Sequence, residues 1–356
     1  MEQDYFIVSY ENVFYNNFMK ILVIRFSSMG DVILATSLFS YLKNAYPESE
    51  IHFLTDARYS GLFKDDTRLA STVGQEKNVD DDAFLQLLFI KWDKVIDLQN
   101  NARSARVLAR LSPGAAVGRF DKKYPQRLLL LFARVNCYGP ADTVAQRYIM
   151  AASDDVETTS MTAPSPHMII AAGTGEALYR SAFSNGVVRP VIALFPFSAW
   201  KNKEWPKHYF LVVGRYFVSK GWNVALLAGP EDRHAALDMK IKLGDRCIAL
   251  AGTLSLYEIA GLLKRCALAL GNDTGLSHLA RACGVKTGVI FGSTTHHFGF
   301  FPFGNPPFRV FQTDLFCRPC HPHGGNRCLF GNRPCLKRIS PEMVIKGLEE
   351  LHHTIS

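Results

Sequence analysis

The amino-acid sequence predicts an α/β protein made of two doubly wound, Rossmann-like domains that face a central cleft. An apolar strand over 21–24, a glycine-containing turn and a helix over 32–44 open a parallel α/β series. A segment rich in Ser, Thr, Ala, Gly and Pro interrupts the alternation between 150 and 190, and a second series then begins with a strand over 191–195. At 356 residues, the chain has room for two domains of ordinary size.

The first series follows an N-terminal extension, residues 1–18, that has no strong periodicity. The pattern predicts further strands over 51–54 and 94–98 and a helix over 103–111. We therefore assign a first Rossmann-like domain to residues 19–165 and a linker region to residues 166–190.

The second series continues after the strand over 191–195. The pattern predicts strands over 224–227, 267–270 and 289–291 and helices over 206–220, 256–265 and 275–282. These elements form a second Rossmann-like domain, residues 191–338, which includes a cysteine-rich loop over 317–335. We expect residues 339–356 to form an amphipathic helix that packs back on the domains.

Composition limits the functions that the chain can have. A content of 48% hydrophobic and 20% charged residues is that of a globular protein. The apolar runs 128–133 and 191–197 are much shorter than the ~20 residues of a membrane-spanning helix. Residues 1–18 lack the basic start and apolar stretch of a signal peptide, so we expect the protein in the cytoplasm. The net charge of +8 reflects either a solvated basic surface or an anionic partner, but no Lys/Arg run resembles a nucleic-acid-binding arm.

The loop 27–31 lies between the first strand and the first helix. Gly30 allows backbone to approach a ligand, and the helix N-terminus favours negative charge. Asp31 has two interpretations: a carboxylate that caps its own helix, or a general base that takes a proton from an acceptor hydroxyl. The loop lacks the G-x-G-x-x-G spacing of a dinucleotide site.

Two further loops follow strands of the second domain. The loop 198–206 contains Lys203, which is either a surface lysine or a cation that neutralises a pyrophosphate. In the loop 272–278, the helix-start amides of Thr274 and Gly275 would form a phosphate seat. His278 either points back at the ligand or has a structural role.

Taken together, these segments resemble glycosyltransferase family 9, the ADP-heptose:lipopolysaccharide heptosyltransferases, and the resemblance covers nearly the whole chain from Met19. Residues 28–31 resemble the family's S-x-G-D loop, and residues 97–104 its D-x-Q…[KR]-S stretch. Residues 203–206 match K-x-W-P, and residues 273–278 match D-[ST]-G-x-x-H. Each motif is weak alone, but four in the family's order and spacing are a specific signal.

The resemblance implies a GT-B fold, with the acceptor on the N-terminal domain and the nucleotide sugar on the C-terminal one. It implies an inverting transfer of heptose from ADP-heptose to the anionic inner core of lipopolysaccharide, without a catalytic metal. Asp31 would be the general base, and Lys203 with the Thr274 and Gly275 amides would stabilise the departing diphosphate.

The resemblance also implies binding roles for other residues. Ser198, Glu231, Asp273 and His278 would bind or orient the donor together with Thr274 and Gly275. The acceptor-binding set would be Ser28, Gly30, Arg103, Arg119 and Lys122, with Arg106 and Arg127 in the same basic group. Solvated surface remains the alternative for each arginine and lysine. We further expect peripheral association with the cytoplasmic face of the inner membrane.

The chain departs from the family after its last core strand. Residues 292–297, Gly-Ser-Thr-Thr-His-His, replace the family's glycine-proline-threonine-aspartate-proline run. Ala199 stands where some members carry a second hydroxyl. The sugar-facing side of the donor pocket therefore differs from the family pattern, and another nucleotide sugar is an alternative donor.

Cys317, Cys320, Cys328 and Cys335 form the remaining pattern. Four thiols in one loop are suitable ligands for tetrahedral zinc or iron, with His321 or His323 as substitutes. The alternative is a set of reduced thiols packed in a loop. A family subgroup that glycosylates autotransporters is similar in using a four-cysteine iron site, although with other spacings. A metal here would be structural.

Three other functions stay open from the sequence. The same fold could use another nucleotide sugar or a protein acceptor. A relative without activity could hold an anionic glycan in a basic cleft. A GT-B sugar-nucleotide epimerase is a third class, which the S-x-G-D and K-x-W-P motifs disfavour.

Overall fold

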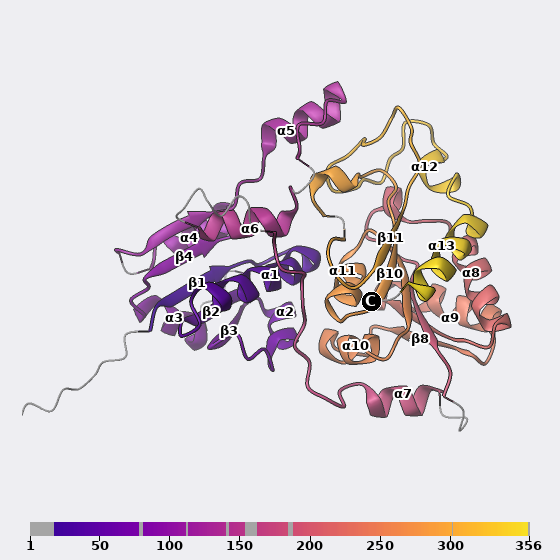
Figure 1. Cartoon of the computed structure of the whole chain (residues 1–356), viewed down its shortest axis with the longest axis horizontal. Helices are drawn as coiled ribbons and strands as arrows, with labels where there is room; N and C mark the ends of the chain where they lie inside the picture. Colours follow the sequence, from indigo (N-terminus) through magenta and orange to yellow (C-terminus); the bar gives the residue numbers. More distant parts are fainter. Residues whose placement is uncertain are drawn as a thin grey trace, which may run out of the picture.

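The computed structural model describes residues 18–77, 81–111, 113–139, 142–153, 162–183, 188–300 and 302–354. Figure 1 shows two α/β domains side by side, the first in indigo to purple and the second in pink-red to yellow. The predicted arrangement of two Rossmann-like domains is therefore confirmed.

The first domain is built on a five-stranded parallel sheet of order β3-β2-β1-β4-β5. Ile24 at the end of β1 pairs with Leu54 and with Asp97, so neighbouring strands end level with one another. The loops that follow these strands consequently meet at one edge of the sheet. The strands are β1 (Lys20–Ile24), β2 (Glu50–Asp56), β3 (Ser71–Gln75), β4 (Lys94–Asp97) and β5 (Ala116–Arg119).

Short helices cover this sheet. Helix α1 packs against α6, and its buried side includes Leu38 and Phe39, which contacts Phe53 of β2 edge to face. The predicted first helix is present but begins at Met29, three residues before the predicted start at residue 32, because Ser28 occupies the N-cap position. The helices are α1 (Met29–Ala45), α2 (Ala57–Ser60), α3 (Asp82–Phe89), α4 (Ala102–Leu108) and α6 (Val144–Ala152), with a 3₁₀ turn η1 (Gly61–Phe63).

A helical segment projects from the first domain. Helix α5 (Tyr124–Leu128) continues into a π-helical turn, η2 (Leu129–Ala133), and we call residues 122–135 the α5 arm. In Figure 1 this arm stands apart from the domain sheets, at the top of the view. The sequence analysis predicted neither helix.

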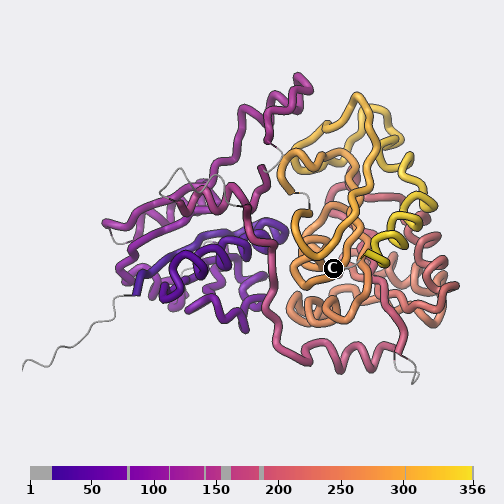
Figure 2. The backbone as a smooth tube through the Cα atoms, in the orientation of Figure 1, coloured from indigo at the N-terminus to yellow at the C-terminus, as the bar shows by residue number. Residues whose placement is uncertain are grey.

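The connection between the domains is extended before it becomes helical. Figure 2 shows the tube leaving the first domain and running beside both domains to α7 (Glu176–Phe183). The region predicted as a linker, residues 166–190, therefore contains one helix of its own.

The second domain has a six-stranded parallel sheet of order β11-β10-β9-β6-β7-β8. Its strands β6 and β7 are completely buried, as their continuous apolar sequences predict for a sheet covered on both faces. The strands are β6 (Val191–Phe195), β7 (Asn223–Ala228), β8 (Cys247–Ala251), β9 (Leu268–Asn272), β10 (Lys286–Ile290) and β11 (Phe308–Phe311).

Helices cover both faces of the second sheet. The last helix, α13, packs on α8, β10 and β11, which all belong to the second domain. Among the described residues, none of the helices combines the length and apolar character needed to cross a bilayer. The helices are α8 (Lys207–Ser219), α9 (Arg233–Leu243), α10 (Leu256–Leu263), α11 (Gly275–Ala282), α12 (Pro334–Lys337) and α13 (Pro341–His353); the 3₁₀ turns are η4 (Lys201–Lys203), η5 (Pro230–Asp232) and η6 (His296–Phe298).

The domains meet through glycines of the two helix-start loops. Helix α1 packs against α11. A Cβ atom on Gly30 would collide with the ring of His278, and one on Gly275 would collide with the side chain of Met29. Only residues without a side chain allow this approach, so both motif loops need glycine where they face each other.

Candidate active site

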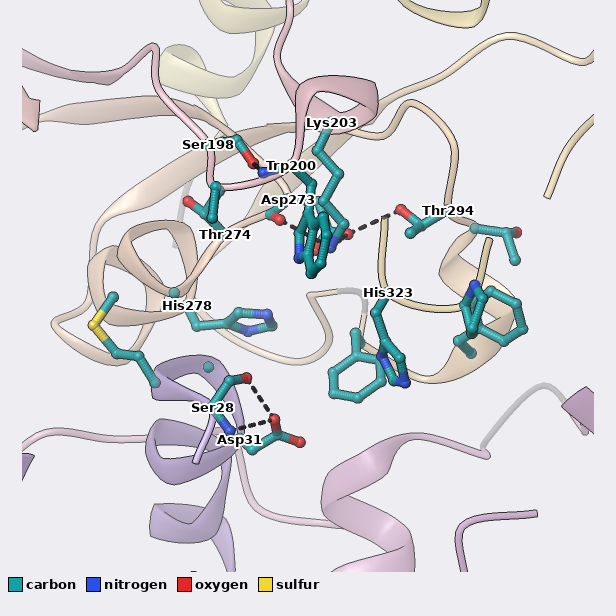
Figure 3. A pocket seen from close by; sticks show the side chains of 18 of the residues that line it. Ser28, Asp31, Ser198, Trp200, Lys203, Asp273, Thr274, His278, Thr294 and His323 are labelled. Atoms are coloured by element: carbon teal, nitrogen blue, oxygen red, sulfur yellow. Dashed lines mark hydrogen bonds and ion pairs between the residues drawn. The ribbon is translucent and has the colours of Figure 1, made fainter. Parts of the chain in front are cut away.

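A cavity of about 520 Å³ lies between the two domains, where the carboxyl ends of the strands face one another. This volume is in the range of small-ligand sites. Both domains contribute to its walls, as Figure 3 shows. The lining residues are Ser28, Met29, Gly30, Asp31, Tyr59, Ser198, Ala199, Trp200, Lys203, Asp273, Thr274, Gly275, His278, Thr294, Thr295, Phe298, Phe300, Pro322 and His323.

Asp31 is the carboxylate that the first domain brings to the cavity. It is at position N3 of α1, and its Oδ2 accepts hydrogen bonds from the backbone N–H of Ser28 at 3.0 Å and from the Ser28 hydroxyl at 2.6 Å. Its Oδ1 forms a 2.7 Å ion pair with Arg25 and accepts a 3.3 Å bond from the Tyr148 hydroxyl. The carboxylate is therefore fixed from both sides. Ser28 is the N-cap residue, and Asp31 caps the same helix from position N3 of a capping box.

The charges around Asp31 keep it ionised. Burial raises the pKa of Asp31, but the Arg25 guanidinium and the two hydrogen bonds from Ser28 outweigh burial and hold the pKa below its ordinary value. Arg25 is itself buried and donates to the carbonyl oxygen of Leu98. At neutral pH the first domain thus presents a rigid carboxylate that can accept a proton.

The D-x-Q…S stretch organises the loop before Asp31. The Oε1 of Gln99 accepts hydrogen bonds from the backbone N–H groups of Phe26 and Ser27, at 3.0 and 3.1 Å. Asp97 accepts from the backbone of Gln99 at 3.0 Å and from the Ser104 hydroxyl at 2.8 Å. This stretch therefore acts on the site through the backbone that leads to Asp31.

Lys203 is the cation that the second domain brings to the cavity. Its ammonium group lies 2.7 Å from Oδ2 of Asp273 and donates to the Asp273 carbonyl oxygen at 3.2 Å. Trp205 fixes the loop, because its backbone N–H donates to Asn272 and its buried indole N–H donates to the carbonyl of Ile339. The K-x-W-P and D-[ST]-G-x-x-H motifs are therefore joined by direct contacts.

Asp273 and His278 carry different charges at neutral pH. Burial raises the pKa of Asp273, but the Lys203 ammonium outweighs burial, and with the Thr294 hydroxyl it holds the pKa below its ordinary value. Burial lowers the pKa of His278, which favours a neutral imidazole. Asp273 thus offsets the charge of Lys203 and leaves it in place to meet an anionic group.

The helix start of α11 has the features of a phosphate seat. Thr274 is the N-cap of α11, and its hydroxyl oxygen is buried without a hydrogen-bond partner among the described residues. An unpartnered buried hydroxyl at a helix N-terminus indicates a ligand that completes its hydrogen bonding. A second cavity of about 130 Å³ continues from this point past Ser198 to Glu231.

Comparison with protein-family models identifies the enzyme family of this chain. The family model described as glycosyltransferase family 9 (heptosyltransferase) matches residues 83–321. The chain belongs to glycosyltransferase family 9. The prediction that the protein is an enzyme that transfers sugars is thereby confirmed.

Curated members of the family are similar over most of their length. Lipopolysaccharide heptosyltransferase 2 of Salmonella typhimurium is 26% identical over 79% of this chain and 84% of its own. Lipooligosaccharide heptosyltransferase 2 of Haemophilus influenzae is 24% identical over 94% of this chain and 99% of its own. The solved structure of Escherichia coli ADP-heptose lipopolysaccharide heptosyltransferase II superposes with a TM-score of 0.74 at 22% identity, covering 94% of this chain and 98% of that one. This likeness confirms the GT-B fold.

The structure brings most of the predicted site residues of this glycosyltransferase together. Asp31, Lys203, Asp273 and His278 line the main cavity, as do Ser28, Gly30, Ser198, Thr274 and Gly275. Glu231 lines the adjoining cavity.

The predicted basic acceptor residues do not line either of these cavities. Arg103 pairs with Asp56 at 3.1 Å and stacks on Phe26, so it is committed to the first domain's own structure. Lys122 donates to the carbonyl oxygen of Asn100, and Arg119 is exposed on β5. Their predicted contacts with an acceptor therefore lie outside these two cavities and stay a prediction.

The sequence analysis missed two residues that contact Asp31 from outside the cavity and one that lines it. Arg25 and Tyr148, which hold Asp31, come from β1's end and from α6. Arg25 could have been predicted as a site residue, because it is a charged residue directly after an apolar strand. No local sequence pattern distinguishes Tyr148 from other buried tyrosines. His323 reaches the cavity from the cysteine-rich loop, where we had considered it only as a metal ligand.

The segment 292–297 is divided between the cavity and its surroundings. Thr294 and Thr295 line the cavity, and the Thr294 hydroxyl donates to Asp273 at 2.9 Å. His296 contacts Gln312 and His297 contacts Asn136, and neither histidine is among the lining residues. The departure from the family pattern therefore reaches the site through its two threonines.

The four cysteines of the loop line a cavity of about 20 Å³ together with Arg318. All four are free thiols, as the sequence analysis had allowed. Among the described residues, no group of three or more His, Cys, Asp or Glu side chains is placed to hold a metal ion. The Cys317, Cys320, Cys328 and Cys335 set thus shares one cavity but does not have the geometry of the predicted zinc or iron site.

Proposed function

We propose that this glycosyltransferase transfers heptose from ADP-heptose to the anionic, lipid-linked inner core of lipopolysaccharide. The observation that carries the proposal is the placement of Asp31 and Lys203 on opposite walls of one cavity. The names of the similar curated enzymes support the choice of heptose and of lipopolysaccharide or lipooligosaccharide. The acceptor would be reached at the cytoplasmic face of the inner membrane.

In the proposed reaction, Asp31 removes a proton from an acceptor hydroxyl. The hydroxyl oxygen attacks the anomeric carbon of the donor, a new carbon–oxygen bond forms, and the bond to the β-phosphate oxygen breaks. The configuration inverts because nucleophile and leaving group lie on opposite faces. ADP leaves with an extra negative charge, which Lys203 and the amides at Thr274 and Gly275 stabilise.

The donor's nucleoside would extend into the cavity that contains Glu231. We expect Glu231→Gln to weaken ADP-heptose binding by about tenfold, because a hydrogen bond to a charged group contributes about 1.5 kcal/mol or more. The value of kcat should stay within about twofold, since Glu231 is distant from the bond that breaks. Calorimetric titration with ADP measures the effect.

Asp238→Asn is the matched control, because Asp238 is exposed on α9, seven residues further along the chain. An equal loss of ADP binding in both variants would mean that surface charge, and not Glu231, is responsible.

We expect transfer to proceed without a divalent metal ion, because Lys203 and backbone amides supply the positive charge that the diphosphate needs. Dialysis against EDTA should leave the rate within about twofold of the untreated enzyme. A rate that collapses and returns with Mg²⁺ or Mn²⁺ would contradict the proposed role of Lys203. Metal analysis of the same samples tests the cysteine-rich loop separately. If the thiols hold a structural metal, the protein should contain one zinc or iron ion per chain, and Cys317→Ser should lose it.

The proposal is tested by incubating the protein with a heptose-deficient core acceptor and a panel of nucleotide sugars. We expect transfer from ADP-heptose and at least tenfold slower transfer from ADP-glucose and UDP-glucose. Preference for another sugar, or for a protein acceptor, would replace the proposed substrate while keeping the reaction. Nucleotide-sugar binding without turnover on any acceptor would favour a glycan-binding relative without activity.

A further inference from the structure

The α5 arm, residues 122–135, leaves large apolar side chains in solvent. Phe132 is 82% exposed and Leu128 is 53% exposed. Monomeric soluble proteins rarely gather large apolar groups on one exposed segment unless the segment has a binding function. The exposed apolar side chains of the arm are Tyr124, Leu128, Leu129, Phe132 and Val135.

The arm is anchored at its base. Leu130 is buried and forms a small apolar cluster with Tyr138 and Phe298. Arg134 donates hydrogen bonds to the carbonyl oxygens of Leu131 and Pro319, the second of which lies in the cysteine-rich loop. These contacts hold the arm against the second domain while its other apolar groups point to solvent.

The charges of the arm have one sign. Residues 122–135 contain two lysines and two arginines and no aspartate or glutamate. Lys123 is partly neutralised by Asp142 at 2.5 Å, whereas Arg134 is exposed. Apolar side chains flanked by cations are the pattern of segments that lie in the surface of anionic membranes.

We propose that the α5 arm docks this glycosyltransferase on an anionic lipid bilayer. Its two helical elements, five residues each, reach roughly 15 Å, half of the ~30 Å hydrocarbon thickness, so the arm lies in the interface and does not span it. The apolar side chains enter the region between headgroups and acyl chains, and the net positive charge of the arm attracts anionic headgroups.

The arm lies next to the active-site cavity. Leu130 packs with Phe298, which lines that cavity. Arg127 lies 3.5 Å from His323, another lining residue. Docking through the arm therefore brings the cavity to the membrane surface, where a lipid-linked acceptor is held. This use of the arm rests on the proposed function, but the docking itself does not.

Vesicle co-sedimentation tests the proposal with the full chain and without donor or acceptor. We expect binding to phosphatidylglycerol-containing vesicles, weakening with added salt, and at least tenfold weaker binding to pure phosphatidylcholine. The variant Leu128→Ser/Phe132→Ser should lose at least tenfold in partitioning to anionic vesicles. The matched control is Phe89→Ser/Ile241→Ser, since Phe89 is 86% and Ile241 is 77% exposed on other helices; it should bind like the unaltered protein.

Membrane docking and sugar transfer can fail independently. Both double variants should unfold at the temperature of the unaltered protein and should keep its rate on a soluble, deacylated core acceptor. Absence of vesicle binding, or equal losses in both double variants, would overturn the docking role. A dimer that dissociates only in the arm variant, measured by light scattering, would instead make the arm a face for a second copy. Vesicle binding without heptosyl transfer would reject the proposed function and leave the arm's role intact.

Discussion

Asp31→Asn is expected to lower kcat by about 10²- to 10⁴-fold, the usual contribution of a general base. The amide keeps the size of the side chain but has no basic oxygen to take the acceptor proton. Steady-state transfer with saturating ADP-heptose measures the loss. Donor affinity should be little changed, because the donor seat at Thr274 and Gly275 belongs to the other domain.

The same substitution has a cost in stability. Arg25 is buried and its carboxylate partner is Asp31, so removing that charge leaves a guanidinium without compensation. Breaking a buried ion pair costs about 3–5 kcal/mol of unfolding free energy. A lower melting temperature is therefore expected, and ADP binding by calorimetry must show that the variant remains folded at the assay temperature.

Asp56→Asn is the matched control for Asp31→Asn. Asp56 is also buried and pairs with Arg58 at 2.8 Å and Arg103 at 3.1 Å, but it does not line the cavity. It should lower stability while kcat stays within about threefold. If both variants lose activity equally, the loss reflects a weakened first domain and the assignment of Asp31 as the base fails.

The depressed pKa of Asp31 also sets how activity and stability change with pH. Ionised Asp31 stabilises the folded chain above the unfolded-state pKa of about 3.9, and this stabilisation disappears as pH falls through the lower folded-state value. Protonation of Asp31 should therefore not limit transfer anywhere between about pH 5 and 8.

Lys203→Ala is expected to lower kcat by about 10²- to 10³-fold. The magnitude follows from losing one charge that is aimed at a leaving group, which costs about 3–4 kcal/mol in comparable sites. The substitution also removes the cation that offsets the buried Asp273 carboxyl group beside the incoming diphosphate. Both effects raise the barrier, and ADP binding should weaken in parallel.

Lys201→Ala is the matched control for Lys203→Ala, because it removes one positive charge from the same turn but not from the cavity. Lys201 lies in the same 3₁₀ turn, but its side chain is exposed and pairs with Glu204 at 3.5 Å. Its loss should change kcat by less than about twofold, which single-turnover transfer can resolve. Comparable losses at both lysines would point to a general effect of charge on donor attraction.

The parts of the site that were predicted from sequence lie in short loops after strands. The apolar pattern of a strand shows where the strand ends, and the residues that start the next helix follow directly. Asp31, Lys203 and Asp273 could therefore be placed at one edge of each sheet. Contacts between distant residues could not be placed. Tyr148 is 117 positions from Asp31, and no local pattern brings them together.

The differences between the predicted and the observed structure also have physical causes. The strand predicted at 289–291 is found at Lys286–Ile290, because polar Lys286 and Thr287 join the ladder next to β9. The acceptor contact predicted for Arg103 from the family resemblance stays a prediction, but the sequence could not show which side chains Arg103 meets within the chain. In the folded chain its guanidinium finds Asp56, 47 positions away, and the surface of Phe26.

The close approach of Gly30 to His278 and of Gly275 to Met29 has a consequence for how the sugar donor is protected. In the proposed reaction the base, Asp31, belongs to one domain and the leaving-group cation, Lys203, to the other, so they act together only where these two loops meet. A donor held by the second domain alone would face water without a base to activate it. Under the proposed function, placing the two charges on separate domains would limit hydrolysis of the sugar donor and reserve it for a bound acceptor.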